Sequence, residues 1–322
     1  MSLDLTFSDE QAGILDAIRK FTKERCPGET VRELAGKFPT ELWAELAELG
    51  VLPIATEDGG GGALEVVAAM EALGAAVFPG PLAETFLATQ ILEGDELQEV
   101  GAGESIVSLS AAPRGDALSL VPWPEQAKVS LQIDGTNIYR CKTVGSPEMV
   151  TSLGGDPYGR VKLERTGEVK NAARGLALFD IAVSAYMAAA GDDLVEVTAE
   201  HARTRKQFGR TLGEFQAVAH PLAESSIALS ASRTLARAAA CAFDEGRDDA
   251  NGLAAGARLS ARKSALFTVY ASHQIFGAMG ITLEGPVYHV SRRIRQLSSA
   301  GASVAVAHEE ALALFGINAV SA

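Results

Sequence analysis

The sequence predicts a mainly helical protein in which a small β module separates two helical parts. Apolar residues recur at helical spacing toward both ends of the 322-residue chain. Between these ends the chain is richer in Gly, Pro, Ser, Thr and Val, and short segments alternate apolar and polar residues as strands do. Ala and Leu, which are good helix formers, are abundant, and aromatic residues make up only 6%. We therefore expect an N-terminal helical domain over residues 1–102, a small β domain over 103–170 and a C-terminal four-helix bundle over 171–322.

The N-terminal part carries start and stop signals for several helices. Ser8 is placed to cap a first helix, because acidic residues follow it directly and apolar residues then recur with helical periodicity. A second helix is expected to begin at Pro39 and Thr40 and to end at Gly50, since glycine commonly follows a helix end. Further helices are expected at residues 63–77 and about 82–93.

The middle and the C-terminal part differ in composition and in the pattern of apolar residues. Fragments such as KVSLQIDG and GRVKLERTG alternate apolar and polar residues and contain turn glycines, which predicts short strands between Ser105 and about Lys170. From Asn171 onward, long Ala-rich runs predict helices. These helices are expected at residues 172–200, 214–246, 251–276 and 302–315.

Composition excludes several classes of protein. With 28 basic and 41 acidic residues, the net charge of −13 gives no general attraction to nucleic acid or to an anionic membrane surface. The three cysteines are far apart and form no CxxC pair, so we expect neither a disulfide framework nor a zinc site. The first residues lack the basic and apolar regions of a signal peptide, and no membrane span is expected. We therefore expect a cytoplasmic protein.

Two patterns that could carry chemistry are better explained otherwise. The Gly59–Gly62 run lacks the GK[ST] ending of a phosphate-binding loop, and we interpret it as a turn between helices. The five histidines have no HExxH or other metal-ligand spacing, and no GxSxG sequence marks a nucleophilic serine. No metal site is therefore predicted.

A basic segment, HARTRKQFGRTLGEFQ at 201–216, stands out in this acidic chain. Arg203, Arg205, Lys206 and Arg210 gather at the end of a predicted helix, and arginine suits bidentate binding of pyrophosphate. Cations at a helix C-terminus are equally explained by the helix dipole. The residues alone leave both interpretations open.

A second segment, HQIFGAMGITLEGPVYHVSRRIR at 273–295, also combines ligand-binding and purely structural features. Gly277 and Gly280 permit close backbone approach to a ligand or to another helix, and Gln274 supplies an amide. Pro286 suits the first turn of a following helix. On its own, the segment predicts only a helix, a tight turn and a second helix.

Together these segments resemble the acyl-CoA dehydrogenase family over nearly the whole chain. The stretch ELWAELAELGVLPIATEDGGGGA is similar to the family's N-terminal Gly-Gly passage, ARTRKQFGRTLGEFQ to its RxQFG motif, and QIFGAMGITLEGP to its QxxGGxG motif. The resemblance implies a helical, β, helical fold and the FAD-dependent α,β-dehydrogenation of an acyl-CoA substrate. It also implies an electron-transfer flavoprotein or a similar acceptor as a partner.

The resemblance also assigns candidate FAD contacts, which in the family reach the ADP half of an FAD held mainly by the neighbouring subunit. Ala278 replaces the second glycine of the family's second motif. The cofactor-binding residues implied by the first motif are Arg205, Gln207, Phe208 and Gln216, and those implied by the second are Gln274, Ile275, Phe276, Gly277, Ala278 and Gly280.

The chain departs from the family at its catalytic base. Ala300 occupies the position of the usual glutamate, which removes the α-proton of the thioester. The alternative family position, on the first helix of the C-terminal domain, falls on Phe179, and the neighbouring Asp180 is a weak candidate. The β domain is also shorter than is usual in the family, and we find no TEPxxGSD-like flavin loop in it.

We therefore expect one subunit of an α2β2 heterotetramer, whose catalytic partner subunit supplies the glutamate and the flavin-ring pocket. The resemblance extends to the short subunits of actinobacterial steroid catabolism, which implies a bulky, steroid-derived acyl group. Two alternatives stay open. One is a self-sufficient homo-oligomeric dehydrogenase with Asp180 as base, and the other is a non-catalytic scaffold without flavin.

Overall fold

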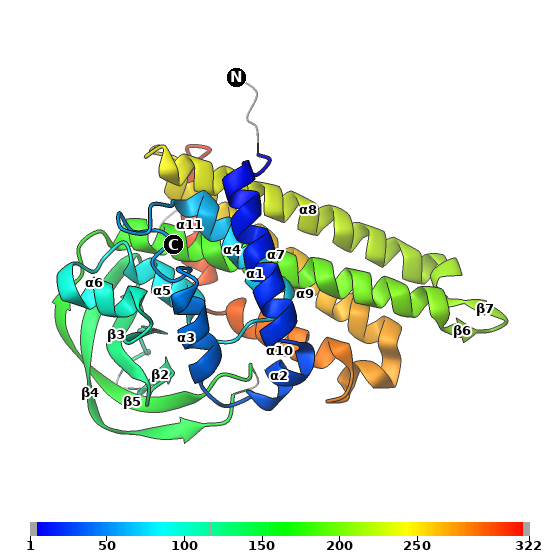
Figure 1. Ribbon diagram of the computed structural model, residues 1–322, viewed down its shortest axis with the longest axis horizontal. Helices are drawn as coiled ribbons and strands as arrows, with labels where there is room; N and C mark the ends of the chain where they lie inside the picture. Colours follow the sequence, from blue (N-terminus) through cyan, green and yellow to red (C-terminus); the bar gives the residue numbers. More distant parts are fainter. Residues whose placement is uncertain (1–4, 116, 153, 318–322) are drawn as a thin grey trace.

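The computed structural model describes residues 5–115, 117–152 and 154–317, which form two helical regions on either side of a five-stranded sheet. Figure 1 shows the sheet at one end of the molecule, beside the N-terminal helices, with the long C-terminal helices running away from it. The predicted fold class is therefore observed.

In the N-terminal region α1 packs against α4, a helix that is buried along almost its whole length. Ser8 caps α1 as predicted: its hydroxyl accepts a hydrogen bond from the Gln11 N–H, and the Gln11 side chain returns one to the Ser8 N–H. The predicted helix over 82–93 is wrong in its extent, because α5 ends at Ala88 and a turn separates it from α6. The bounds are α1 Asp9–Arg25, α2 Gly28–Glu33, α3 Thr40–Glu48, α4 Ala63–Ala75, α5 Leu82–Ala88 and α6 Gly94–Gly101.

The sheet has the strand order β1-β3-β4-β5-β2. β1 and β3 run parallel and the other pairs are antiparallel, with β3 and β4 joined by a tight turn between Asp134 and Asn137. The Ser108 hydroxyl donates to the Pro122 carbonyl oxygen at 2.6 Å, so the two edge strands β1 and β2 also approach each other. The bounds are β1 Ile106–Ala111, β2 Ser119–Pro122, β3 Ala127–Asp134, β4 Asn137–Val150 and β5 Tyr158–Glu168.

The C-terminal region is built on α7, which lies between α4, α8 and α9. This helix is long and apolar enough to cross a membrane, but most of its apolar stretch is buried against these neighbours, as in the core helix of a soluble protein. Gly74 of α4 allows the close contact with α7, because a Cβ there would lie 2.4 Å from the Tyr186 carbonyl oxygen. The bounds are α7 Ala172–Thr204, β6 Lys206–Gln207, β7 Arg210–Thr211, η1 Leu212–Glu214, α8 Gln216–Asp244, α9 Ala250–Phe276, η2 Gly277–Ile281, α10 Pro286–Leu297 and α11 Val304–Ala313.

Candidate functional site

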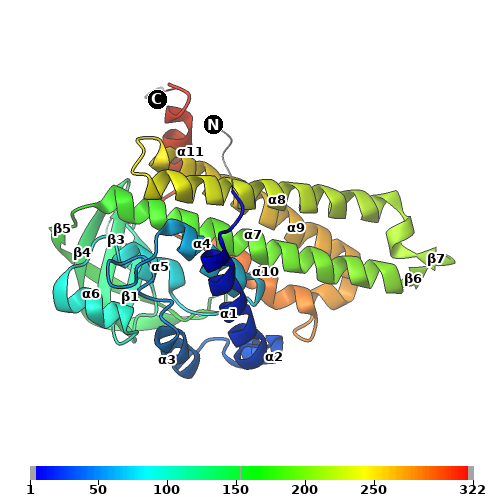
Figure 2. The same ribbon diagram turned by 45° about the horizontal axis from the view of Figure 1, so that its top comes forward.

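The basic segment folds into a small hairpin at the far end of the helical bundle, where α7 turns back into α8 (Figures 1 and 2). β6 and β7 pair through Lys206 with Thr211 and Gln207 with Arg210. The turn places Phe208 at φ 53° and Gly209 at φ 81°, both in the left-handed region. Phe208 is 91% exposed, so the hairpin presents an aromatic ring to solvent. The residue that carries this ring adopts an unfavourable backbone conformation.

The second predicted segment lies at the same end of the bundle. The ring of His201, in the last turn of α7, stacks on the ring of Phe276, at the end of α9, with centroids 4.2 Å apart. Gly277 then ends α9 at φ 59°, and Gly280 packs so closely that a Cβ would lie 3.2 Å from the His273 backbone. The structure thus brings the two motifs together although they are separated by about 60 residues in the sequence.

The cations of the hairpin are not equivalent. Arg203 pairs with Glu200 at 3.2 Å, and the Arg210 guanidinium lies 3.9 Å from the centroid of the Phe215 ring. The backbone N–H of Arg205 caps α7 by donating to the His201 carbonyl oxygen at 2.9 Å, whereas its guanidinium makes no hydrogen bond or ion pair within the described part of the chain. Its guanidinium is therefore available to an anion.

Three of the remaining predicted contacts are exposed amide side chains on elements of the bundle. Gln216 is exposed at the first turn of α8, Gln274 is exposed near the end of α9, and Gln207 is exposed on β6. Ala278 and Gly277 are also exposed, whereas Phe276 and Gly280 are buried and Ile275 is partly buried. A free guanidinium, amide groups and a close-approach backbone fit the pyrophosphate and adenosine of a dinucleotide, and the fit covers the ADP half of FAD.

A cavity of about 700 Å³ lies between the sheet, the start of α5 and the C-terminal end of α10. Ala300 and Gly301 form part of its wall, so the position at which we expect the family's glutamate lines a cavity. The segment that follows β1 forms another part of the wall through Pro113 and Arg114. Apolar side chains make up much of the remainder, including Leu109, Leu118, Leu120, Pro122 and Val150.

Sequence reasoning missed the carboxylate that lines this cavity. Glu84, in the first turn of α5, is the one acidic side chain among the described lining residues. Burial raises the pKa of Glu84 to about 7, against an opposing effect of the nearby Arg293 charge. The signal was present in the sequence, because Glu84 interrupts the apolar run from Leu82 to Leu87, whose other members are all buried.

Asp180, the weak candidate for the base, lies inside the bundle and is not among the residues that line the cavity. Its carboxylate lies 3.3 Å from a guanidinium nitrogen of Arg258, and both side chains are almost fully buried. Arg258 also donates to the carbonyl oxygens of Ala300 and Ala302, the latter at 2.7 Å. Asp180 thus serves as the counter-ion of the arginine that holds the turn containing Ala300.

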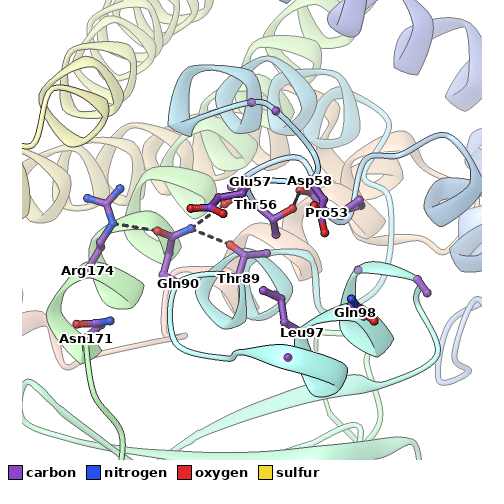
Figure 3. A pocket seen from close by; sticks show the side chains of 16 residues that line it. Pro53, Thr56, Glu57, Asp58, Thr89, Gln90, Leu97, Gln98, Asn171 and Arg174 are labelled. Atoms are coloured by element: carbon purple, nitrogen blue, oxygen red, sulfur yellow. Dashed lines mark hydrogen bonds between the residues drawn. The ribbon is translucent and has the colours of Figure 1, made fainter.

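A second and more open cavity, of about 1030 Å³, lies between the loop before α4, the end of α5 and the start of α7. Figure 3 shows Gln90 at its centre, where the amide accepts from Arg174 and donates to the Thr89 hydroxyl, each at 3.0 Å. The Gln90 amide also donates to the Ala55 carbonyl oxygen. Gln90 thus binds both Thr89 and Arg174 at the centre of this cavity. None of the predicted site residues is among the residues that line it.

The glycine run at the edge of this second cavity is a packed turn rather than a phosphate cradle. The N–H groups of Gly60, Gly61 and Gly62 donate to Thr56, Ile54 and Glu65. The first N–H groups of α4 donate to the Asp244 carboxylate, at 2.7 Å and 3.1 Å. The groups that would bind a phosphate are therefore already satisfied within the chain.

Comparison with known proteins identifies the class of this fold and site. The model of the acyl-CoA dehydrogenase N-terminal domain matches residues 8–101, and that of the C-terminal domain matches residues 170–304. Together these matches span well over half of the chain. The chain belongs to the acyl-CoA dehydrogenase family, whose members are FAD-dependent oxidoreductases that act on CH–CH bonds.

Individual relatives are distant but extend over most of the chain. Acyl-CoA dehydrogenase FadE27 of Mycobacterium tuberculosis is 29% identical over 72% of this chain and 74% of its own length. Acyl-CoA dehydrogenase IpdE2 of the same organism is 26% identical over 80% of both chains.

Solved structures share the fold at low identity. A chain of the Tcur3481-Tcur3483 steroid ACAD variant superposes with a TM-score of 0.81, at 21% identity, over 96% of this chain and 98% of its own. A chain of the ChsE4-ChsE5 complex from Mycobacterium tuberculosis gives a TM-score of 0.75 at 20% identity, over 98% of each chain. The predicted acyl-CoA dehydrogenase-like fold is thereby confirmed.

Proposed function

We propose that this chain is one subunit of a heteromeric, FAD-dependent acyl-CoA dehydrogenase, with an α2β2 assembly. In this proposal it contributes contacts to the ADP half of FAD and a subunit interface, while a catalytic partner subunit supplies the glutamate. The observation that carries the proposal is the contrast between two sites. The bundle end has an arginine with an unpaired guanidinium and several exposed amides, whereas the cavity wall has Ala300 at the position where we expect the base.

The similarity to a chain of the Tcur3481-Tcur3483 steroid ACAD supports a bulky, steroid-derived acyl-CoA as the substrate class. The similarity to a chain of the ChsE4-ChsE5 complex supports the heteromer. We further propose a cytoplasmic location and an electron-transfer flavoprotein or a similar protein as the electron acceptor. These assignments agree with a buried α7 and a strongly acidic chain.

Each residue of the bundle end has a defined task in this proposal. Arg205 binds the pyrophosphate through charge-assisted hydrogen bonds, and Gln216 and Gln274 bind the neutral groups beside it. The turn at Gly277 and Ala278 lets the backbone approach the cofactor, and Phe208 covers it from the hairpin. FAD would supply the hydride acceptor, and the residues of this chain would hold and orient its ADP half.

Flavin retention tests the proposal. The chain is expressed alone and together with candidate dehydrogenase-like partners, and the visible flavin spectrum is measured after size-exclusion chromatography. Flavin and a stable tetramer are expected only on co-expression. Stoichiometric flavin bound by this chain alone would contradict the need for a partner.

A matched pair of variants tests the role of Arg205. Arg205→Ala is expected to weaken FAD binding by the complex about tenfold or more, since a hydrogen bond to a charged group contributes ~1.5–3 kcal/mol. Arg203→Ala is the control, because Arg203 is on the same helix turn but is already paired with Glu200. Equal flavin content in both variants would remove Arg205 from the site.

The self-sufficient alternative makes a different prediction for Asp180. If Asp180 were the base, Asp180→Asn would abolish turnover by the complex, whereas in our proposal turnover persists once the variant is folded. The burial of Asp180 against Arg258 favours a structural role. A scaffold without flavin would have no use for the free guanidinium of Arg205, and absence of flavin from every assembly would support it.

A further inference from the structure

The cavity beside Ala300 contains a carboxyl group that the proposed function leaves unexplained. Glu84 enters it from α5, whereas Ala300 belongs to the turn after α10, so the two positions lie on different walls. No hydrogen bond or ion pair joins the Glu84 side chain to another side chain in the described part of the chain. A hydrogen bond from its own backbone N–H satisfies part of this partly buried carboxyl group, and its remaining acceptor sites are left for a ligand or water.

The nearest charges do not neutralise Glu84. Arg293, which is close enough to affect its titration, is already bound to the Asp156 carboxylate and donates to the Gly80 carbonyl oxygen at 2.8 Å. Asp156 also accepts from Gln296 at 2.6 Å and opposes the effect of Arg293 on Glu84. The Glu84 carboxyl group therefore makes no hydrogen bond to the Arg293–Asp156 ion pair, although it feels the charge of both residues.

The surroundings restrict what Glu84 can bind. Arg114 and Arg295 line the same cavity, and the Arg293 charge acts on Glu84, so a cationic ligand group would be repelled. An anionic group would be repelled by Glu84 itself whenever it is ionised. A neutral hydroxyl group meets neither obstacle, because it can donate to a carboxylate and accept from a protonated carboxyl group.

We infer that Glu84 hydrogen-bonds a hydroxyl group on the acyl part of the ligand and thereby selects hydroxylated acyl-CoA thioesters. The apolar wall formed by Leu109, Leu118 and Leu120 accommodates the carbon skeleton of such a ligand. This inference rests on the proposed function for the nature of the ligand. It adds a specificity-determining residue and a substrate class.

Burial supports the assignment, because it raises the pKa of Glu84 to about 7. Near neutral pH the group therefore exchanges between donor and acceptor forms, and either form can bind a hydroxyl group. Selection of this kind can be strong, since a polar group built to bind a hydroxyl is left unsatisfied by an analogue that lacks it.

Binding of CoA thioethers tests the inference without requiring turnover. Pairs of S-alkyl-CoA and S-(ω-hydroxyalkyl)-CoA with alkyl chains of about four to twelve carbons place the hydroxyl at successive distances from the sulfur. Dissociation constants are measured by calorimetry on the full chain alone and on the complex. We expect at least one hydroxylated probe to bind about tenfold more tightly than its plain counterpart.

Substitutions of Glu84 test whether its side chain recognises the hydroxyl group of the ligand. Glu84→Leu is expected to abolish the preference, and Glu84→Gln to retain part of it, because an amide still hydrogen-bonds a hydroxyl. Glu104→Leu and Glu104→Gln serve as controls, because Glu104 is exposed and lies outside the cavity lining. Flavin content of the complex is expected to be the same in all variants.

Three results would overturn the inference. These are the absence of a hydroxyl preference at every chain length, a preference that survives in Glu84→Leu, and equal weakening of plain and hydroxylated probes. Under the first of these results, loss of α-proton exchange in Glu84→Gln would make Glu84 the base instead. If instead the proposed heteromer is wrong, flavin will be missing while the preference for hydroxylated probes persists, so the two failures can be told apart.

Discussion

Arg258 determines where the backbone beside the cavity lies. It is 2% exposed, and its guanidinium connects the Asp180 carboxylate to the carbonyl oxygens of Ala300 and Ala302. Arg262 adds a hydrogen bond to the Ser298 carbonyl oxygen at 3.0 Å. Gly301 completes the turn at φ 76°, where a Cβ would lie 2.5 Å from the Phe179 ring. A side chain at position 300 therefore faces the cavity because buried charges fix the turn.

Removing one partner of this pair should be costly. Arg258→Met leaves the Asp180 carboxylate buried without its counter-ion, which is expected to lower the free energy of unfolding by about 3–5 kcal/mol. In the double variant Arg258→Met with Asp180→Leu, neither partner of the pair is charged, and the part of the loss due to the unpaired Asp180 should be recovered, whereas the part due to the Ala300 and Ala302 carbonyl oxygens remains. Denaturant unfolding of both variants measures this, and a single-variant loss under about 1 kcal/mol would contradict it.

Glu84 predicts a pH dependence of stability. Its pKa of about 7 in the folded chain lies above the ordinary value of 4.5, so the folded state holds a proton that the unfolded chain releases between these values. The contribution of Glu84 to stability is therefore largest below about pH 4.5 and falls as pH rises to about 7. In thermal unfolding measured across this range, Glu84→Gln should flatten the profile and be more stable than the wild type at pH 8 by ~1–2 kcal/mol. Parallel profiles for the two proteins would contradict the assignment.

At the scale of elements, the β6–β7 hairpin combines an unfavourable backbone with an exposed ring. Phe208 adopts φ 53°, a conformation that asparagine and glycine tolerate better than an aromatic residue. Its ring contacts Phe215 edge-to-face at 6.3 Å between centroids but remains almost fully exposed. The strain is consistent with a functional role for the ring at this position.

The variant Phe208→Asn separates strain from function. Relief of the backbone strain should leave the free energy of unfolding unchanged or raise it by up to about 1 kcal/mol. Loss of the ring should nevertheless lower FAD retention by the assembled complex. Thermal unfolding and flavin content are measured on the same samples. A variant that unfolds earlier while keeping its flavin would show that the ring has only a structural role.

The same elements show what sequence could and could not predict. The capping of α1 by Ser8 and the end of α9 at Gly277 depend on neighbouring residues, and local pattern found both. The helix expected over 82–93 was predicted too long because its apolar run continues past Ala88, where the Thr89 and Gln90 side chains instead bind neighbouring backbone carbonyl groups. Glu84 was missed because its importance arises from distant residues, such as Arg293 and Ala300, that only the folded chain brings near it.

At the scale of the whole molecule, buried contacts hold the N-terminal helices to the bundle. Arg237 of α8 donates two hydrogen bonds to Glu71 of α4, at 2.8 Å and 2.9 Å, and its guanidinium lies over the Phe7 ring. The Tyr186 hydroxyl of α7 donates to the Phe78 carbonyl oxygen at 2.9 Å. Large apolar side chains remain exposed at several places on the molecule, and one group of them lies at the far end of the bundle.

Ile281 and Leu283, which follow α9 at that end, are 71% and 58% exposed, and Met279 beside them is 56% exposed. Exposed apolar residues gathered near a candidate cofactor site indicate a surface that a partner subunit covers.

Ile281→Glu should therefore weaken assembly of the co-expressed complex, because association would bury a charge. The free energy of unfolding of the isolated chain should change by no more than about 0.5 kcal/mol. Leu49→Glu is the control, since Leu49 is 50% exposed but lies on the N-terminal helices. Light scattering after size-exclusion chromatography measures the assembly. If Ile281→Glu assembles like the wild type while Leu49→Glu does not, the subunit interface lies on the N-terminal helices and the FAD site at the bundle end is completed without a partner.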